Sequence, residues 1–223
     1  MKYFKIFFLI IIFSCSNNHE SKKLQNHQRI DLGEIESDEI LEASGIASSR
    51  FNQNILWTHN DSGDLNRIFA MDINGNHVGE FFLNNVENRD WEDIAIGPGP
   101  MEDVDYIFVG DIGDNRSEND VKYIYRFAEP QVYTNNQSLD INIDNIDQIS
   151  YQYEDGNRDA ETLIVDPITK DIIIISKREE SAVHVYLLPF PHDTENILTA
   201  QLIMTKDFYP NINFNTSQWI VAG

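Results

Sequence analysis

The chain has 223 residues, of which 37 are acidic and 16 are basic, and its formal net charge at pH 7 is −21. This charge repels phosphate backbones, so we expect no nucleic-acid partner. With 41% hydrophobic residues and one cysteine, the composition is that of a folded protein rather than a disordered tail, and it excludes disulfides within the fold.

The first 28 residues indicate export. Two lysines precede a short apolar run from Ile6 to Phe13, which is the pattern of a signal peptide over residues 1–14. The run ends in Ile-Phe-Ser-Cys and resembles the bacterial lipobox, so Cys15 is the predicted lipidation site; the alternative is an ordinary secreted or signal-anchored protein. Residues 15–28 then form a polar, flexible tether. The sequence predicts a membrane-anchored lipoprotein of the bacterial cell envelope, facing the periplasm or the cell surface.

From residue 29 onward, short segments rich in β-branched and aromatic residues alternate with turn residues, and no stretch carries a sustained helical period. We therefore expect an all-β domain with little helix. The predicted strands are Trp57–His59, Arg67–Ile73, His77–Leu83, Tyr106–Val109, Lys122–Phe127, Ile149–Tyr153, Ile172–Ile175, Val183–Leu188 and Leu202–Phe208.

These strands recur as a unit. Residues 88–96 (NRDWEDIAI) align without a gap to residues 157–165 (NRDAETLIV), and residues 42–47 (EASGIA) are a looser third copy. Four antiparallel strands that recur about every fifty to seventy residues are typical of propeller blades. We predict that residues 29–223 form a β-propeller of four-stranded antiparallel blades, in an incomplete ring that is truncated at its C-terminal end.

Blade geometry predicts where the acidic residues gather. Strands alternate in direction, so the loop after the second strand and the entry to the first strand lie on one face of the ring. Those loops and entries hold acidic groups such as Asp61, Asp114, Asp90 and Asp159. We therefore expect one face to be rich in carboxylates near the axis.

The runs LWTHNDSG, DWEDIA, GDIGDN, YRFAEP and DAETLIVDP resemble a group of largely uncharacterised secreted bacterial β-propeller proteins. This group is distantly similar to the phytase-like propellers, also described as having the esterase-like activity of phytase. The resemblance covers roughly residues 42–190 and implies a propeller fold and dependence on calcium.

Three functions compete for the acidic face. The first is a divalent cation site, with Ca²⁺ favoured because oxygen ligands abound and soft ligands are lacking. The competing interpretation is that these side chains only cap turns. The predicted ligands are Asp90, Glu92, Asp93, Asp111, Asp114, Asn115, Asp159 and Glu161.

The second function is metal-dependent hydrolysis of an ester or phosphoester. Lys177 and Arg178 are candidate substrate-binding cations, and Asp93 is the candidate general base. These basic groups could equally pair with neighbouring acids.

The third function is recognition without chemistry, in which a rigid disc of strands holds a small molecule, a glycan or a protein. We take extracytoplasmic binding of a ligand or partner through the acidic face, with or without bound Ca²⁺, as the leading prediction. The phytase-like hydrolase is the alternative.

Overall fold

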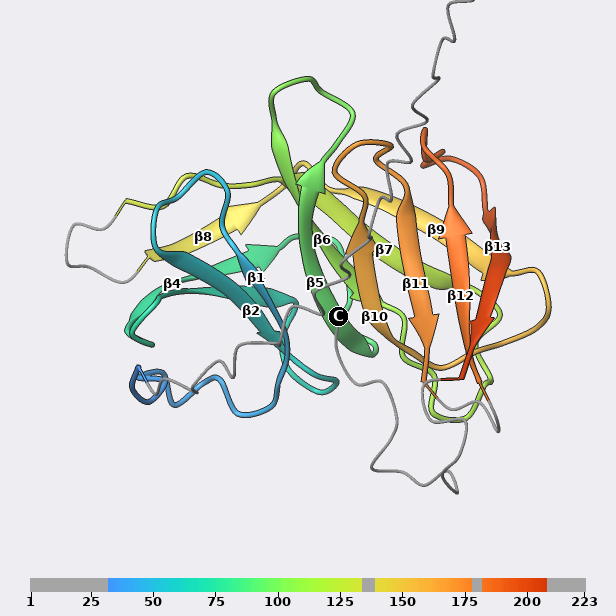
Figure 1. The fold of residues 1–223 in the computed structure, drawn as a ribbon. Helices are drawn as coiled ribbons and strands as arrows, with labels where there is room; N and C mark the ends of the chain where they lie inside the picture. Colours follow the sequence, from blue (N-terminus) through green and yellow to red (C-terminus); the bar gives the residue numbers. More distant parts are fainter. Residues whose placement is uncertain (1–31, 134–138, 178–181, 208–223) are drawn as a thin grey trace, which may run out of the picture. The chain divides into compact units, whose positions relative to one another are not determined.

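The computed structural model describes residues 32–133, 139–177 and 182–207, and every regular element in this part of the chain is a β-strand (Figure 1). The all-β prediction is confirmed. The predicted signal peptide (1–14), Cys15, the tether (15–28) and Arg178 lie outside the described residues. Within the described ranges, no helix is long and apolar enough to cross a membrane.

Thirteen strands follow one another along the chain. They are β1 (Ala43–Ser48), β2 (Ile55–Asn60), β3 (Arg67–Asp72), β4 (His77–Leu83), β5 (Trp91–Pro98), β6 (Asp105–Asp111), β7 (Lys122–Ala128), β8 (Leu139–Ile143), β9 (Asp147–Tyr153), β10 (Ala160–Val165), β11 (Ile172–Ser176), β12 (Val183–Leu188) and β13 (Leu198–Lys206).

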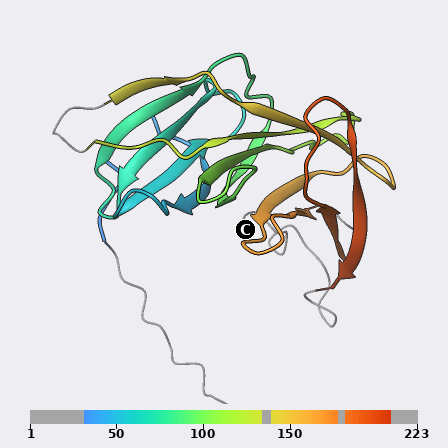
Figure 2. The same ribbon diagram turned by 90° about the horizontal axis from the view of Figure 1, so that it is seen from above.

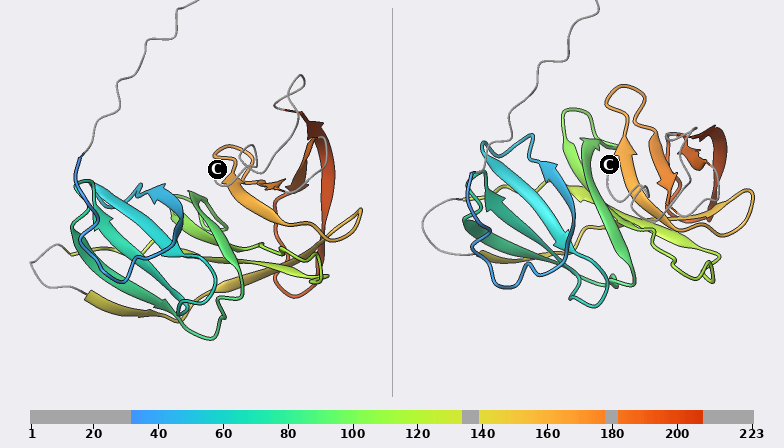
Figure 3. Two further views of the ribbon diagram at one scale, coloured as in Figure 1. Left: turned by 90° about the horizontal axis from the view of Figure 1, so that it is seen from below. Right: turned by 60° about the horizontal axis from the view of Figure 1, so that its bottom comes forward.

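Three groups of four strands pair in antiparallel fashion. The first group is β1–β2–β3–β4, the second is β5–β6–β7–β9, and the third is β10–β11–β12–β13. Each group begins with a strand that pairs with a neighbouring strand on one edge only. These first strands follow one another in space, because β5 lies beside β1 on one side and beside β10 on the other (Figure 3).

Two parallel pairings join the groups. After β7 the chain leaves the second group, adds β8 to the outer edge of β4, and returns as β9 (Figure 2). Strand β9 also pairs in parallel with β13 of the third group. The result is one five-stranded sheet and one eight-stranded sheet, and the eight-stranded sheet is nearly closed and barrel-like because its end strands, β5 and β10, lie side by side.

The apolar core has two parts, one on each side of the second group. Along β6, Tyr106 and Phe108 face one part, whereas Ile107 and Val109 face the other. Alternation of side chains along a strand places successive residues on opposite faces, so a sheet covered on both sides reads as a continuous apolar run. The second group is therefore the central layer, and one part of the core packs against each of its faces.

Candidate functional site

The first strands of the three groups share an irregularity. Their pairing shifts register between Ala43 and Gly45, between Trp91 and Asp93, and between Ala160 and Thr162. A shift of this kind leaves one extra residue that re-aims its side chain, as in a β-bulge. The extra residues are Ser44, Glu92 and Glu161, which thus hold equivalent positions.

A second set of equivalent positions follows the second strand of each group. The amides of Asp61, Gly113 and Lys177 donate hydrogen bonds to the carbonyl oxygens of Glu42, Asp90 and Asp159, at 2.9, 3.2 and 2.9 Å respectively. These bonds tie each loop to the entry of its own first strand. The predicted meeting of loops and entries is therefore present in all three groups.

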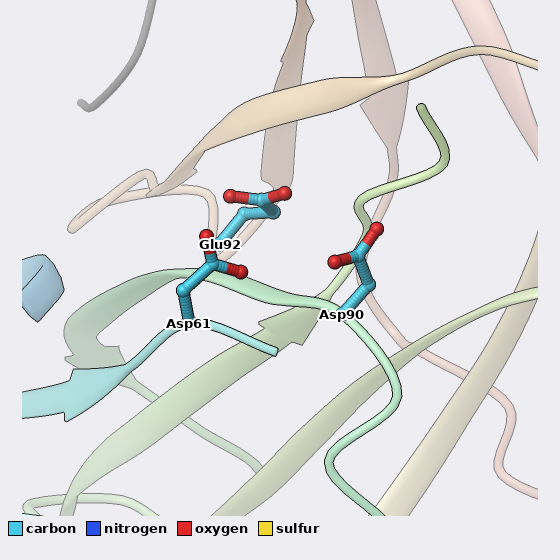
Figure 4. A group of neighbouring side chains, drawn as sticks. All are labelled: Asp61, Asp90 and Glu92. Carbon is cyan, nitrogen blue, oxygen red and sulfur yellow. The ribbon is translucent and has the colours of Figure 1, made fainter. Parts of the chain in front are cut away.

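Together these positions form an acidic cluster, which we define as Asp61, Asp90, Glu92, Asp159 and Glu161. Carboxylate oxygens of Asp61, Asp90 and Glu92 lie within 4.8 Å of one another (Figure 4), and so do those of Glu92, Asp159 and Glu161. Glu92 belongs to both triads. Four of the predicted ligands are thus brought together, and Asp61, which the predicted ligand set omits, joins them.

Gly113 lets two of these carboxylates approach the loop. A Cβ atom at this position would lie 2.4 Å from Asp90 Oδ2 and 2.4 Å from Glu92 Oε1. Any larger side chain would have to push them aside. The equivalent residues in the other groups are Asp61 and Lys177. The three equivalent positions therefore hold an acidic, an uncharged and a basic residue.

Burial dominates the electrostatics of the cluster. Glu92 is 3% exposed, and burial raises its pKa to about 9, with the neighbouring carboxylates adding to the effect. Burial likewise raises the pKa of Asp90, and the charges of Asp61 and Asp159 contribute. Burial also raises the pKa of Glu161, although its ion pair with Lys177 opposes the shift. Simultaneous ionisation of all five carboxyl groups of the cluster is therefore unfavourable.

Asp111 supports the cluster from behind. Its Oδ1 accepts a hydrogen bond from the backbone amide of Asp90 at 3.0 Å and lies 3.4 Å from Nε of Arg89. Burial raises the pKa of Asp111 to about 6. The structure places this predicted ligand so that it orients the main chain of Asp90.

Asp114 organises the loop after β6. Its carboxylate accepts hydrogen bonds from Nζ of Lys122 at 2.6 Å and from the amides of Glu118 and Asn119, both at 2.9 Å. Burial would raise the pKa of Asp114, but these donors outweigh it and hold the pKa below its ordinary value. The amide of Asp114 in turn donates to Asp159 Oδ1 at 2.8 Å, so the loop is tied to the cluster.

Asp93 bridges two first strands. Its Oδ2 accepts the amide of Leu163 on β10 at 2.8 Å, and its Oδ1 accepts the amide of Ile94 at 2.9 Å. Both oxygens of this predicted ligand and candidate base are thus engaged with the main chain. Lys177, the second candidate for catalysis, pairs with Glu161.

A cavity of about 460 Å³ opens beside the cluster. The predicted ligand Asn115 is exposed there, next to Arg116, and Asp90 contributes to the wall. Arg89 also lines the cavity, and its guanidinium donates to the carbonyl oxygens of Val121 and Asp111. Asp90 is the member of the acidic cluster that lines this cavity, so a ligand bound there would meet its carboxylate.

Comparison with known proteins adds no assignment. No protein-family model matches the chain, and no curated protein matches it.

Proposed function

We propose that the protein is an extracytoplasmic binding protein that holds a divalent cation, Ca²⁺ first among them, in the acidic cluster. The observation that carries this proposal is the pair of carboxylate triads that share the buried Glu92. In this proposal Cys15 carries the lipid anchor that keeps the protein in the cell envelope.

The antiparallel groups are, in the same proposal, blades of a propeller. Three features support this: each group has four antiparallel strands, each first strand bulges at an equivalent residue, and the first strands lie side by side. In a propeller the innermost strands surround the axis. The acidic cluster would then lie at one end of the axis, where loops from all blades meet.

The donor set fits a hard cation. The cluster offers only carboxylate oxygens, which Ca²⁺ accepts in sets of six to eight together with carbonyl groups and water. A bound cation would favour the ionised form of Glu92, whose pKa burial raises. Gly113 leaves Asp90 and Glu92 room to turn toward a shared ion.

Luminescence of Tb³⁺, a Ca²⁺ analogue, tests the proposal. Trp91 lies between Asp90 and Glu92 in the chain and is fully buried, so excitation of tryptophan should sensitise a lanthanide in the cluster. We expect saturable emission from the purified full chain that Ca²⁺ displaces. Asp90→Asn should weaken binding roughly tenfold or more, because fewer charged ligands lower the affinity of such sites.

Asp140→Asn is the matched control, because Asp140 is an exposed residue of β8 and the change removes the same charge. It should leave the Tb³⁺ titration unchanged. Equal titration curves for the two variants, or no sensitised emission from the wild-type chain, would refute binding at the cluster.

The cavity beside the cluster favours a second candidate function, hydrolysis of an ester or phosphoester. Arg116 and Asn115 line this cavity next to Asp90, so an anionic substrate would find a cation and hydrogen-bonding groups there. Turnover of p-nitrophenyl phosphate or acetate that stops with chelator and falls in Arg116→Gln would support this candidate. Absence of turnover in a chain that binds Ca²⁺ would refute hydrolysis and leave binding as the one proposed function.

A further inference from the structure

One of the two carboxylate triads already holds a positive charge that belongs to the chain. The ammonium of Lys177 forms an ion pair with Glu161, and the amide of Lys177 donates to the carbonyl oxygen of Asp159 at 2.9 Å. Both partners belong to the triad of Glu92, Asp159 and Glu161, which we call the second triad. The side chain of Lys177 is 14% exposed and that of Glu161 is 6% exposed, so this ion pair is largely shielded from water.

The first triad, which consists of Asp61, Asp90 and Glu92, differs in this respect. In the described part of the chain, no basic side chain forms an ion pair with any of these three residues. At the position equivalent to Lys177, the first group carries Asp61, a carboxylate that joins the triad itself. The second group carries Gly113 there, where a Cβ atom would lie 2.4 Å from Asp90 Oδ2 and from Glu92 Oε1. The first triad therefore combines three acidic groups with a close approach that requires glycine.

This difference in charge decides which triad can take a free cation. The ammonium of Lys177 is a compact point charge, and it also acts on Glu92, since it opposes the rise in pKa that burial causes there. A divalent ion in the second triad would have to displace Lys177 or lie beside it, and like charges at short range in a buried site repel strongly. In the first triad, the ion would meet three carboxyl groups without an ammonium among them.

We infer that Lys177 is a built-in counter-ion that excludes a second divalent cation, so that the acidic cluster takes one ion, held by Asp61, Asp90 and Glu92. This inference rests on the proposed cation binding, and it specifies where the ion lies and how many ions are bound. Without the ammonium, Glu92 would lie between two cations, as in two-metal sites whose ions are about 3.5–4 Å apart. Lys177 thus determines the stoichiometry of the site although it is not a ligand.

Titration of the full chain counts the ions, with Tb³⁺ followed by tryptophan-sensitised emission and Ca²⁺ followed by isothermal calorimetry. We expect one tightly bound ion per wild-type chain and two per Lys177→Met chain, because methionine keeps an unbranched side chain and removes the ammonium. Lys177→Arg keeps the charge and should bind one ion. Lys206→Met is the matched control, since Lys206 is exposed at the end of β13, and it should also bind one ion.

The double variant Lys177→Met/Glu161→Gln locates the second ion. It removes both members of the ion pair and leaves the second triad with one carboxylate fewer, so the number of bound ions should return to one. If Lys177→Met fails to fold, the wild-type chain decides the question. The anomalous signal of Tb³⁺ in wild-type crystals should give one peak, beside Asp61 and Asp90.

Three results would overturn the inference while leaving cation binding in place. They are two ions in the wild-type chain, a Tb³⁺ peak beside Asp159 and Glu161 instead of Asp61 and Asp90, and a single ion in a folded Lys177→Met chain. A wild-type chain that binds no ion would refute the proposed function and the inference with it, so the two failures are distinguishable.

Discussion

Without a divalent cation, the free energy of unfolding is expected to fall by roughly 2 kcal/mol between pH 7 and pH 9. The cause is Glu92, whose pKa burial raises from the ordinary 4.5 to about 9. Between these two values the folded chain keeps a proton on Glu92 that the unfolded chain has released. The unfolded state then binds fewer protons, so stability decreases as pH rises, and the penalty disappears below pH 4.5, where both states are protonated.

Chemical denaturation in chelator, repeated at several pH values, measures this decline. Glu92→Gln keeps a neutral side chain of the same shape, so the variant should lose most of the decline and exceed the wild-type stability at pH 8. Saturating Ca²⁺ should also flatten the wild-type curve, because the cation replaces the proton and stabilises the folded state by mass action.

Glu102→Gln is the control for this experiment, because Glu102 is exposed in the loop between β5 and β6. It should retain the wild-type decline. A chelated wild-type chain with constant stability from pH 7 to pH 9 would contradict the prediction, and so would a Glu92→Gln variant that declines as steeply as the wild type.

Most of the strands could be predicted because their signal is local. A segment such as Tyr106–Val109 is apolar and rich in aromatic and β-branched residues, whichever neighbours it acquires. The strand Leu139–Ile143 is not among the predicted strands, although its sequence LDINI alternates apolar and polar residues. Its position beside β4 could not be predicted, because the pairing joins segments that are distant in the sequence.

The acidic cluster was partly predictable from the repeat. The aligned copies contain Asp90 and Glu92 in one and Asp159 and Glu161 in the other, and strand direction implies that they share an edge. Strand direction also predicts that the loop of Asp61 lies on the acidic face, but the predicted ligand set omits this residue. The matching main-chain hydrogen bonds of Asp61, Gly113 and Lys177 show which residue of each loop lies next to the entry of its first strand.

The sequence alone does not distinguish the acidic residues of the cluster from those whose carboxylates accept hydrogen bonds from backbone amides. Asp93, Asp111 and Asp114 are of the same residue type as Asp90 and come from the same loops and entries. Their oxygens, however, accept backbone amides of Leu163, Asp90 and Asn119. Which amides turn toward a carboxylate depends on bulges and loop conformations, which residue type alone does not determine.

Truncation of Asp114 to alanine is expected to cost about 3–5 kcal/mol of stability, because it leaves a buried charge unpaired. Lys122 is 0% exposed, and its Nζ lies 2.6 Å from Asp114 Oδ2. Asp114→Ala would remove this counter-ion and also strand the amides of Glu118 and Asn119. Urea denaturation followed by tryptophan fluorescence measures the loss.

The double variant Asp114→Ala/Lys122→Met separates the two contributions, since it removes the buried ammonium together with its partner. It should recover part of the lost stability, and the remainder should reflect the two half-buried amides that lose their acceptor. A double variant no more stable than Asp114→Ala would show that the ion pair is not the cause. Because the amide of Asp114 holds Asp159 Oδ1, both variants should also weaken Tb³⁺ binding, even though the proposed ligands are unchanged. Weaker Tb³⁺ binding in both variants would show that the loop after β6 helps to fix the geometry of the acidic cluster.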